Sequence, residues 1–468
     1  MITLSGIEGQ KYAVLGLGKT GLATAASLRA SKAHVVVWDD GPDTRVEALH
    51  AGYEVADLSQ INLEGFAALL LSPGIPHTHP KPHPAVMHAR ATQVPVIGDV
   101  ELLFRACPEA TTIGITGTNG KSTTTALIGH ILASAGRKVQ VGGNLGTPVL
   151  SFEPLGKDGV YVLELSSYQL ELIQHNRLNV SVLLNITPDH IERHGGMQGY
   201  IDAKARIFET DAPQVLVIGS DDLETRALMI RARQKKNIRI EEISVQHPVA
   251  QGVMTAGQQI FAYTGEEEGG LVASLSAFKS LPGKHNAQNA CAAFAACRAV
   301  GIPTKQIVEG LKTFPGLAHR QQLITEIDGV RFINDSKATN ADAAGKALAC
   351  YDNIYWIIGG RSKEGGLNGL EEFTPRIRQA FIIGEASESF GRWCEGKIPY
   401  TQCGTLDVAI EKAAATAWQQ KKPGAVVLLS PACASWDQFA NFEERGRIFG
   451  ELAQSLSSAK AYRTAIIR

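Results

Sequence analysis

The segment that most constrains this chain is GITGTNGKST, residues 114–123, which places a glycine-rich turn between a predicted strand (Thr112–Thr116) and a helix that begins at Lys121. Glycines let backbone amides curl around phosphate oxygens, and the helix N-terminus adds a partial positive charge. Lys121 can reach the β- and γ-phosphates, and Ser122 can ligate magnesium. The upstream glycine is Gly114, whereas the general P-loop pattern requires glycine at 115. The segment predicts an α/β fold with a nucleotide site; the alternative is a structural glycine turn.

The length of the chain predicts several domains. At 468 residues, with roughly 100 to 200 residues per domain, three domains are expected. Short β-branched runs alternate with helical stretches throughout, which is typical of parallel α/β layers. We predict a Rossmann-like N-terminal domain, a central P-loop ATPase domain and a Rossmann-like C-terminal domain, with bounds 1–98, 99–314 and 315–468.

Composition excludes several classes of protein. The formal charge of -1, with both signs interspersed, argues against a nucleic-acid partner. The N-terminus lacks the pattern of a signal peptide, and no apolar run is long enough to span a bilayer. The seven cysteines are scattered without a CxxC pair, which favours a reducing compartment over a disulfide framework or a zinc site. We expect a cytoplasmic protein without a membrane partner.

A second glycine-rich loop spans residues 16–21, GLGKTG, and either Asp39 or Asp40 follows at the distance typical of a dinucleotide fingerprint. Taken alone, this loop would predict an NAD-dependent oxidoreductase. The same backbone can hold any diphosphate at a helix N-terminus. Because the chain already carries an ATP-type loop, a substrate linked to a nucleoside diphosphate is the better interpretation. A structural turn remains the alternative.

Candidate metal ligands follow two predicted strands of the middle segment. Glu164 ends one strand, and Asp189 and His190 come after the next, at the edge of an α/β sheet where ligands bind. Magnesium prefers oxygen donors, so one carboxylate completed by phosphate oxygens is a normal shell, and histidine is a less usual ligand. The histidines of the 77–83 stretch are separated by prolines and are not expected to bind a metal.

Phosphoryl transfer to a carboxylate brings several anions together, so the site needs cations besides magnesium. The last segment opens with His319-Arg320, and it supplies Lys337 and Lys363 in loops after predicted strands. Taken singly, a lysine of this kind is more often a solvated surface charge than a ligand. Their placement after strands favours a role in binding.

Several of these motifs together resemble the Mur ligase family of bacterial cell-wall synthesis, over all three predicted domains. They are GITGTNGKST at 114–123, HNAQNA at 285–290, PGLAHR at 315–320 and NDSKATN at 334–340. Within the family, SPGIP at 72–76 and LSPACASWDQFANFEERG at 429–446 resemble the branch that adds D-glutamate to UDP-N-acetylmuramoyl-L-alanine.

The resemblance implies a nucleotide site with ATP and Mg²⁺ as cofactors. The residues expected at the ATP phosphates are Gly117, Thr118, Asn119, Gly120, Lys121, Ser122 and Thr123. Those expected at the rest of the nucleotide are Asn286, Asn289, Arg320 and Asp335. The catalytic residues implied are Lys121, Glu164, His190 and Lys204, and the magnesium ligands are Ser122, Glu164, His190 and Lys204 as a carbamate.

Lys204 matches the family lysine that reacts with carbon dioxide. A carbamate turns the cation into a magnesium-binding anion, which requires an unprotonated amine and therefore a lowered pKa. Pattern alone would make Lys204 an exposed helix residue.

The resemblance also implies the substrate contacts. Thr20, Asp39 and Ser72 would hold the UDP end, and Asn144 would approach the phosphates. The residues expected to position D-glutamate are Lys337, Thr339, Lys363, Ser435 and Phe442.

The mechanism expected from this resemblance passes the γ-phosphoryl group of ATP to the substrate carboxylate, and the amine of D-glutamate attacks the resulting acyl phosphate. The third domain would close to exclude water, and His190 is one candidate for the base. We expect a monomer. The alternatives are another ligase of the superfamily, a dinucleotide-dependent oxidoreductase and a binding protein without turnover.

Overall fold

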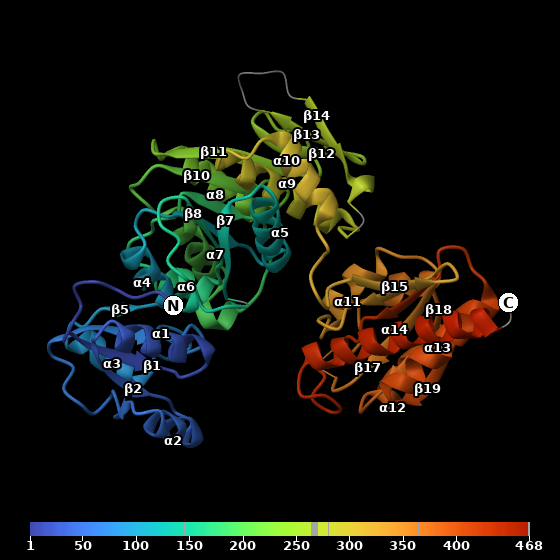
Figure 1. Cartoon of the computed structure of the whole chain (residues 1–468), viewed down its shortest axis with the longest axis horizontal. Coiled ribbons are helices and arrows are strands. Elements are labelled where there is room, and N and C mark those ends of the chain that lie inside the picture. Colours follow the sequence, from blue (N-terminus) through green and yellow to red (C-terminus); the bar gives the residue numbers. More distant parts are fainter. Residues whose placement is uncertain (145, 264–269, 279, 363–364, 467–468) are drawn as a thin grey trace. The chain divides into compact units, whose positions relative to one another are not determined.

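A computed structural model of the chain describes residues 1–144, 146–263, 270–278, 280–362 and 365–466. These residues form sheets of five, nine and six strands. The chain divides into two compact units, which are residues 1–279 with 284–314 (unit 1) and residues 280–283 with 315–468 (unit 2). Unit 1 contains the first two sheets and unit 2 the third (Figure 1). The predicted fold class, three α/β domains, is confirmed.

The first sheet is parallel throughout, in the order β3-β2-β1-β4-β5. Its strands are β1 (Lys11–Leu15), β2 (His34–Trp38), β3 (Glu54–Val55), β4 (Phe66–Leu71) and β5 (Val96–Ile97), and its helices are α1 (Lys19–Ala30), α2 (Pro42–His50), α3 (Pro84–Ala91) and α4 (Asp99–Ala106). The β-branched and leucine runs of β2 and β4 are buried, as expected for a sheet covered on both faces. Since β1 lies between β2 and β4, the loops that follow these strands meet at one edge.

The second sheet has the order β14-β13-β12-β11-β10-β9-β6-β8-β7. Its strands are β6 (Thr111–Thr116), β7 (Lys138–Gly143), β8 (Gly159–Glu164), β9 (Val180–Leu183), β10 (Gln214–Gly219), β11 (Ile238–Ser244), β12 (Gly252–Ala256), β13 (Gln259–Tyr263) and β14 (Gly270–Ser274). The helices are α5 (Lys121–Ser134), α6 (Ser167–Glu171), α7 (Met197–Ala205), α8 (Leu223–Arg233), α9 (Lys284–Ala299) and α10 (Thr304–Thr313), with short 3-10 turns η1 (Val149–Ser151), η2 (Ile191–His194), η3 (Arg206–Phe208) and η4 (Leu275–Ala277). Strand β6 lies between β8 and β9, so the loop after β6 is flanked by the loops after both neighbours.

The predicted parallel strands of this sheet are confirmed, but its antiparallel edge was not predicted. Strands β12, β13 and β14 pair antiparallel, and the β12–β13 turn contains Gly257 at φ +58°. A left-handed turn residue suits such a hairpin.

The first two sheets share one hydrophobic core. Ile2 and Leu4 of the N-terminus pack in the same buried cluster as Leu150 and Phe152. The backbone N–H of Ile2 donates to the carbonyl of Leu150 at 3.0 Å. Contacts between the N-terminal and middle segments are therefore part of the interior of unit 1.

The third sheet, in unit 2, has the order β15-β16-β20-β17-β18-β19 and is parallel except for β15. Its strands are β15 (Gln322–Ile327), β16 (Val330–Asn334), β17 (Ile354–Gly359), β18 (Ile377–Ile383), β19 (Tyr400–Gly404) and β20 (Val426–Leu429). The helices are α11 (Ala341–Leu348), α12 (Ser387–Cys394), α13 (Leu406–Gln420) and α14 (Phe442–Ile466), and η5 is Glu371–Arg376. Among the described helices of both units, none is long and apolar enough to span a bilayer.

Candidate active site

The loop between β6 and α5 has the backbone of a phosphate cradle. Gly117 and Gly120 have φ values of +150° and +86°, and Gly120 is the N-cap of α5. A Cβ on Gly120 would lie 2.3 Å from Oδ1 of Asn289, so a larger residue is excluded by both conformation and contact. The backbone N–H groups at the start of α5, where Ser122 and Thr123 lie, face outward from a helix N-terminus that attracts anions.

Lys121 folds back over this loop. Its Nζ donates to the carbonyl oxygens of Gly117 at 2.8 Å and Thr118 at 2.9 Å. A triphosphate is bound by an ammonium group together with the backbone N–H groups of a helix N-terminus. Lys121 and the start of α5 provide both, so the loop fits ATP.

Lys204 was expected from its pattern to be an exposed helix residue, and that expectation is wrong. It is 1% exposed in α7, and its Nζ donates to the carbonyl of Gly117 at 2.9 Å and lies 4.7 Å from the centre of the Tyr200 ring. Burial, and then the charge of Lys121, lower the pKa of Lys204 well below its ordinary value. Two lysines thus share one carbonyl acceptor, and the buried one is biased toward its neutral form.

Residues that the sequence analysis did not single out hold the cradle in place. The side-chain Oδ1 of Asn185 accepts from the backbone N–H of Asn119 at 2.9 Å, and its Nδ2 donates to Gln288 at 2.9 Å. The hydroxyl of Tyr200 lies 3.1 Å from the hydroxyl of Thr118, one of the predicted loop residues. Asn185 follows the buried strand β9, and Gln288 and Tyr200 lie on helices. In the sequence, these residues look like polar residues of an exposed helix face or loop, so apolar periodicity gives only a weak signal for selecting them.

Glu164 is buried and hydrogen-bonded to Asn144, whereas His190 is exposed. The Glu164 side chain is 3% exposed at the end of β8 and accepts from Nδ2 of Asn144 at 2.9 Å. His190 is exposed at φ +51°, with its Nε2 3.4 Å from Asp189. Within the described ranges, no three His, Cys, Asp or Glu side chains form a metal-binding group. A cation here would need further oxygen donors, such as the Ser122 hydroxyl and phosphate oxygens.

Asn286 and Asn289, predicted to hold the nucleotide, lie buried at the start of α9. The Nδ2 of Asn289 donates to Oδ1 of Asn286 at 3.0 Å, and the Thr124 hydroxyl donates to Oδ1 of Asn289 at 3.2 Å. The pair therefore connects α9 to α5 and packs against Gly120.

The second glycine-rich loop, residues 16–21, is closed by a carboxylate. Oδ2 of Asp39 accepts from the backbone N–H of Leu17 at 2.7 Å, and the Ser72 hydroxyl donates to the carbonyl of Gly16 at 2.8 Å. Thr20 lies in the first turn of α1. The three predicted UDP contacts thus gather around this loop, with Asp39 and Ser72 bonded directly to it.

In unit 2, Asp335, Lys337 and Thr339 follow β16 and Ser435 follows β20, whereas Arg320 precedes β15 and Phe442 begins α14. Asp335 accepts from the Ser430 hydroxyl at 2.8 Å and from the backbone N–H of Gln321 at 3.1 Å, and burial raises its pKa to about 7. The charge of Arg320 opposes this shift. Nζ of Lys337 lies 4.8 Å from the ring centre of Phe442.

The remaining D-glutamate candidates include Thr339, whose N–H donates to the carbonyl of Lys337 at 2.9 Å, and Ser435, which is 2% exposed. Lys363 lies outside the described residues. Arg445, which the sequence analysis did not select, is 0% exposed and donates to the carbonyls of Ser336 at 2.8 Å and Cys433 at 3.1 Å. It ties together the loops that carry these candidates.

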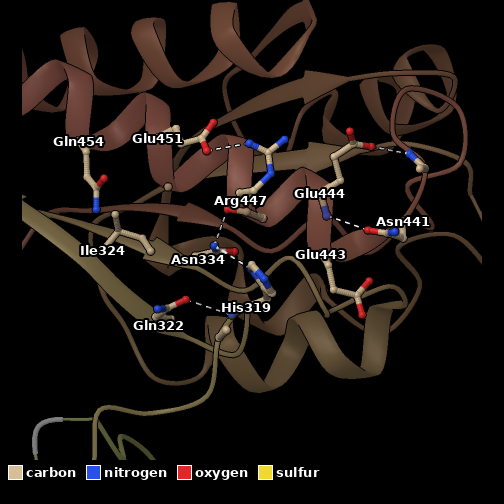
Figure 2. A pocket seen from close by; sticks show the side chains of 14 residues that line it. His319, Gln322, Ile324, Asn334, Asn441, Glu443, Glu444, Arg447, Glu451 and Gln454 are labelled. Atoms are coloured by element: carbon tan, nitrogen blue, oxygen red, sulfur yellow. Dashed lines mark hydrogen bonds and ion pairs between the residues drawn. The ribbon is translucent and has the colours of Figure 1, made fainter. Parts of the chain in front are cut away.

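A pocket of about 640 Å³ lies beside the same loops (Figure 2). Figure 2 shows the His319 ring against Asn334, whose Nδ2 lies 3.2 Å from Nδ1 of His319 and donates to the carbonyl of Gly446 at 2.8 Å. None of the predicted site residues lines this pocket. His319 and Asn334 precede Arg320 and Asp335 in the chain, so their contacts fix the backbone that presents those two residues.

Comparison with known proteins identifies related sequences over almost the whole chain. Residues 10–98 match the family described as Mur ligase MurD-like, N-terminal domain, and residues 115–297 match the Mur ligase middle domain. A UDP-N-acetylmuramoylalanine--D-glutamate ligase from Paramagnetospirillum magneticum is 50% identical over 462 residues, which cover 98% of this chain and 100% of the relative. The enzyme of the same name from Rhodospirillum rubrum is 51% identical, covering 98% of each chain.

A solved structure of UDP-N-acetylmuramate-alanine ligase from Thermotoga maritima has a TM-score of 0.56 and 18% identity, covering 95% of this chain and 99% of that one. At that identity the likeness shows the fold alone. The relatives that match at full length decide the family. The chain therefore belongs to the Mur ligase family, and its full-length relatives there are UDP-N-acetylmuramoylalanine--D-glutamate ligases.

Proposed function

We propose that this protein joins D-glutamate to UDP-N-acetylmuramoyl-L-alanine in the cytoplasm, as a step in the synthesis of peptidoglycan precursors. As a Mur ligase it is an ATP-dependent amide ligase. The choice of substrates rests on its full-length relatives. One observation supports the proposed phosphoryl transfer from ATP: Lys121 and Lys204 both donate to the carbonyl of Gly117, beside a helix N-terminus.

We assign one task to each predicted domain. Residues 1–98 would bind the UDP end through Thr20, Asp39 and Ser72, and Asn144 would hold the substrate near the phosphates. Residues 99–314 would bind ATP, and residues 315–468 would bind D-glutamate. The protein would act as a monomer.

ATP would supply the phosphoryl group that activates the substrate carboxylate as an acyl phosphate, while Mg²⁺, held by Ser122, Glu164, His190 and carbamylated Lys204, would offset negative charge. Lys121 would turn its Nζ from the loop carbonyls toward the phosphate oxygens. The loop amides would orient those oxygens, since helix N-termini bind anions without reorganising.

The lowered pKa of Lys204 supports its proposed carbamylation. A neutral Nζ can attack the carbon of CO₂, forming a C–N bond and releasing one proton. The resulting carbamate is an anion beside the cradle, whereas the unmodified ammonium would add a second cation. Asn144 would keep Glu164 oriented, as hydrogen-bonded partners do for metal ligands.

The proposal is tested by measuring phosphate release from ATP with UDP-N-acetylmuramoyl-L-alanine, comparing D-glutamate with L-glutamate, L-lysine and glycine. We expect release that depends on D-glutamate. Release with a different amine would leave the ligase assignment standing and refute the amino-acid assignment. Loss of activity on chelation of divalent cations, restored by magnesium, would test the metal separately.

A further inference from the structure

The side chain of Arg193 is a cation whose hydrogen-bonding capacity is only partly used. Arg193 lies in η2, three residues after His190. Its Nη2 donates to the carbonyl of Ile75 at 3.0 Å. Its Nε and Nη1 are buried and have no hydrogen-bond partner among the described residues. A buried guanidinium with unused donors is costly unless an anion or water completes it.

The carboxylate of Glu171 does not form an ion pair with Arg193. Its Oε1 pairs with Nδ1 of His194 at 3.3 Å, and its Oε2, 3.9 Å from Nε2 of His77, has no hydrogen-bond partner among the described residues. Within the described ranges, Arg193 forms no ion pair with any Asp or Glu. Its guanidinium carbon lies 4.8 Å from the ring centre of Tyr168, a cation–π contact that leaves the Nε and Nη1 donors unused.

The position of Arg193 connects the two substrate regions of unit 1. The Ile75 carbonyl that it binds belongs to the loop of residues 72–76, which packs on Gly16 of the first glycine-rich loop. On the other side, the Tyr168 ring lies 5.4 Å from the ring of His190. Arg193 therefore contacts the loop that packs on residues 16–21 on one side and the Tyr168 ring beside His190 on the other.

We propose that Arg193 is a substrate-binding residue whose free guanidinium donors take an anionic oxygen of the sugar nucleotide, from either its diphosphate or its alanyl carboxylate. This inference rests on the proposed function. The competing role is a structural latch, in which Arg193 only ties residues 72–76 to η2.

The test measures binding of three ligands to the full-length protein by calorimetry: UDP, a UDP-sugar without a carboxylate, and UDP-N-acetylmuramoyl-L-alanine. Arg193→Gln removes the charge, and Arg193→Lys keeps it without the planar fork. We expect Arg193→Gln to raise the Kd of the full substrate by about 10- to 100-fold, as for loss of a hydrogen bond to a charged group, with Arg193→Lys intermediate. The KM for ATP should stay within about twofold of the wild-type value.

The ligand series separates the two sources of the anion. If the diphosphate is the partner, all three ligands weaken alike; if the carboxylate is the partner, only the full substrate weakens. Arg206→Gln is the matched control, because Arg206 is likewise bound to backbone carbonyls: it donates to that of Leu170 at 2.8 Å and to that of Ile173 at 2.6 Å. This control should alter thermal stability without altering Kd.

The proposal is overturned if Arg193→Gln lowers Tm as the control does and leaves all three Kd values unchanged, because that is the behaviour of a latch. Failure of the proposed function would look different. In that case the wild-type protein itself would not bind the full substrate, whichever residue stands at 193.

Discussion

The two glycine-rich loops of unit 1 share a plan and differ in charge. Both join a strand to a helix, and both place a Gly-Lys pair followed by a hydroxyl residue at the helix start: Gly18-Lys19-Thr20 and Gly120-Lys121-Ser122. The first loop is closed by the carboxylate of Asp39, whereas the second is covered by the ammonium group of Lys121 and the buried amine of Lys204. The backbone therefore offers an anion site in both, and side chains from elsewhere decide what each loop can bind.

The largest effect predicted from this comparison is at the lysine of the second loop. Lys121→Met should lower kcat/KM by about 1000-fold, because a positioned cation is lost from the transferring phosphoryl group. Lys19→Met is the matched control, since Lys19 has the same place in the first loop and is exposed. It should change kcat/KM by no more than about twofold. Steady-state phosphate release measures both. Equal effects at the two lysines would mean that the loops do not differ in function.

Lys204 provides the next test, because its charge state separates the two loops. Lys204→Met, which keeps length and removes the amine, should lower kcat at least about 100-fold, as for loss of a group that supports a metal site. The wild-type activity should depend on added bicarbonate, and that of the variant should not. Partial rescue of Lys204→Ala by short carboxylates would support an anionic role. Full activity of either variant would remove Lys204 from the site.

The lowered pKa of Lys204 also predicts a pH dependence of stability. A depressed pKa means that the folded state disfavours the protonated amine, so the wild-type protein loses stability as pH falls below the ordinary lysine value toward the folded pKa. Lys204→Met removes this penalty. Its free energy of unfolding, relative to wild type, should therefore be more favourable at pH 6 than at pH 9 in urea titrations. A difference that is constant with pH would contradict the assigned environment.

The two glycine-rich loops could be predicted from the sequence, whereas the burial of Lys204 could not, because it depends on residues far away in the chain. The loops, their flanking strands and the fold class follow from glycine spacing and apolar periodicity, which are local. The burial of Lys204 is not local: α7 places it under the loop after β6, and its hydrogen bonds are with residues 87 and 88 positions away. Arg193 and Asn185 escaped selection for the same reason, since their partners lie 118 and 66 positions away.

The third sheet extends the comparison to a second carboxylate that follows a parallel strand. Asp39 follows β2 and is partly exposed, whereas Asp335 follows β16 and is buried, which raises its pKa to about 7. A raised pKa contributes stability that is complete below the unfolded value near 3.8 and is lost as pH rises toward about 7. Between those two pKa values, the free energy of unfolding of the wild-type protein should fall by up to about 1.4 kcal/mol per pH unit because of Asp335, and Asp335→Asn should remove this pH dependence. Unfolding in urea at pH 5 and pH 7 measures it; identical slopes would refute a protonated Asp335.

The smallest predicted effect is at Asp39 and tests the first loop directly. A carboxylate at a helix N-terminus repels a phosphate and accepts hydrogen bonds, so Asp39 should recognise donor groups of the ribose or base of the UDP end while the loop amides hold the diphosphate. Asp39→Asn keeps an oxygen that can accept from the Leu17 N–H but loses the charge. We expect the KM for the sugar nucleotide to rise about 10-fold, with kcat and the KM for ATP unchanged, as for one charged hydrogen bond. A lower KM in the variant would instead mean that Asp39 serves only to repel phosphate. The charge difference between the loops would then keep phosphate groups away from the first loop, and Asp39 would not recognise the ribose or base.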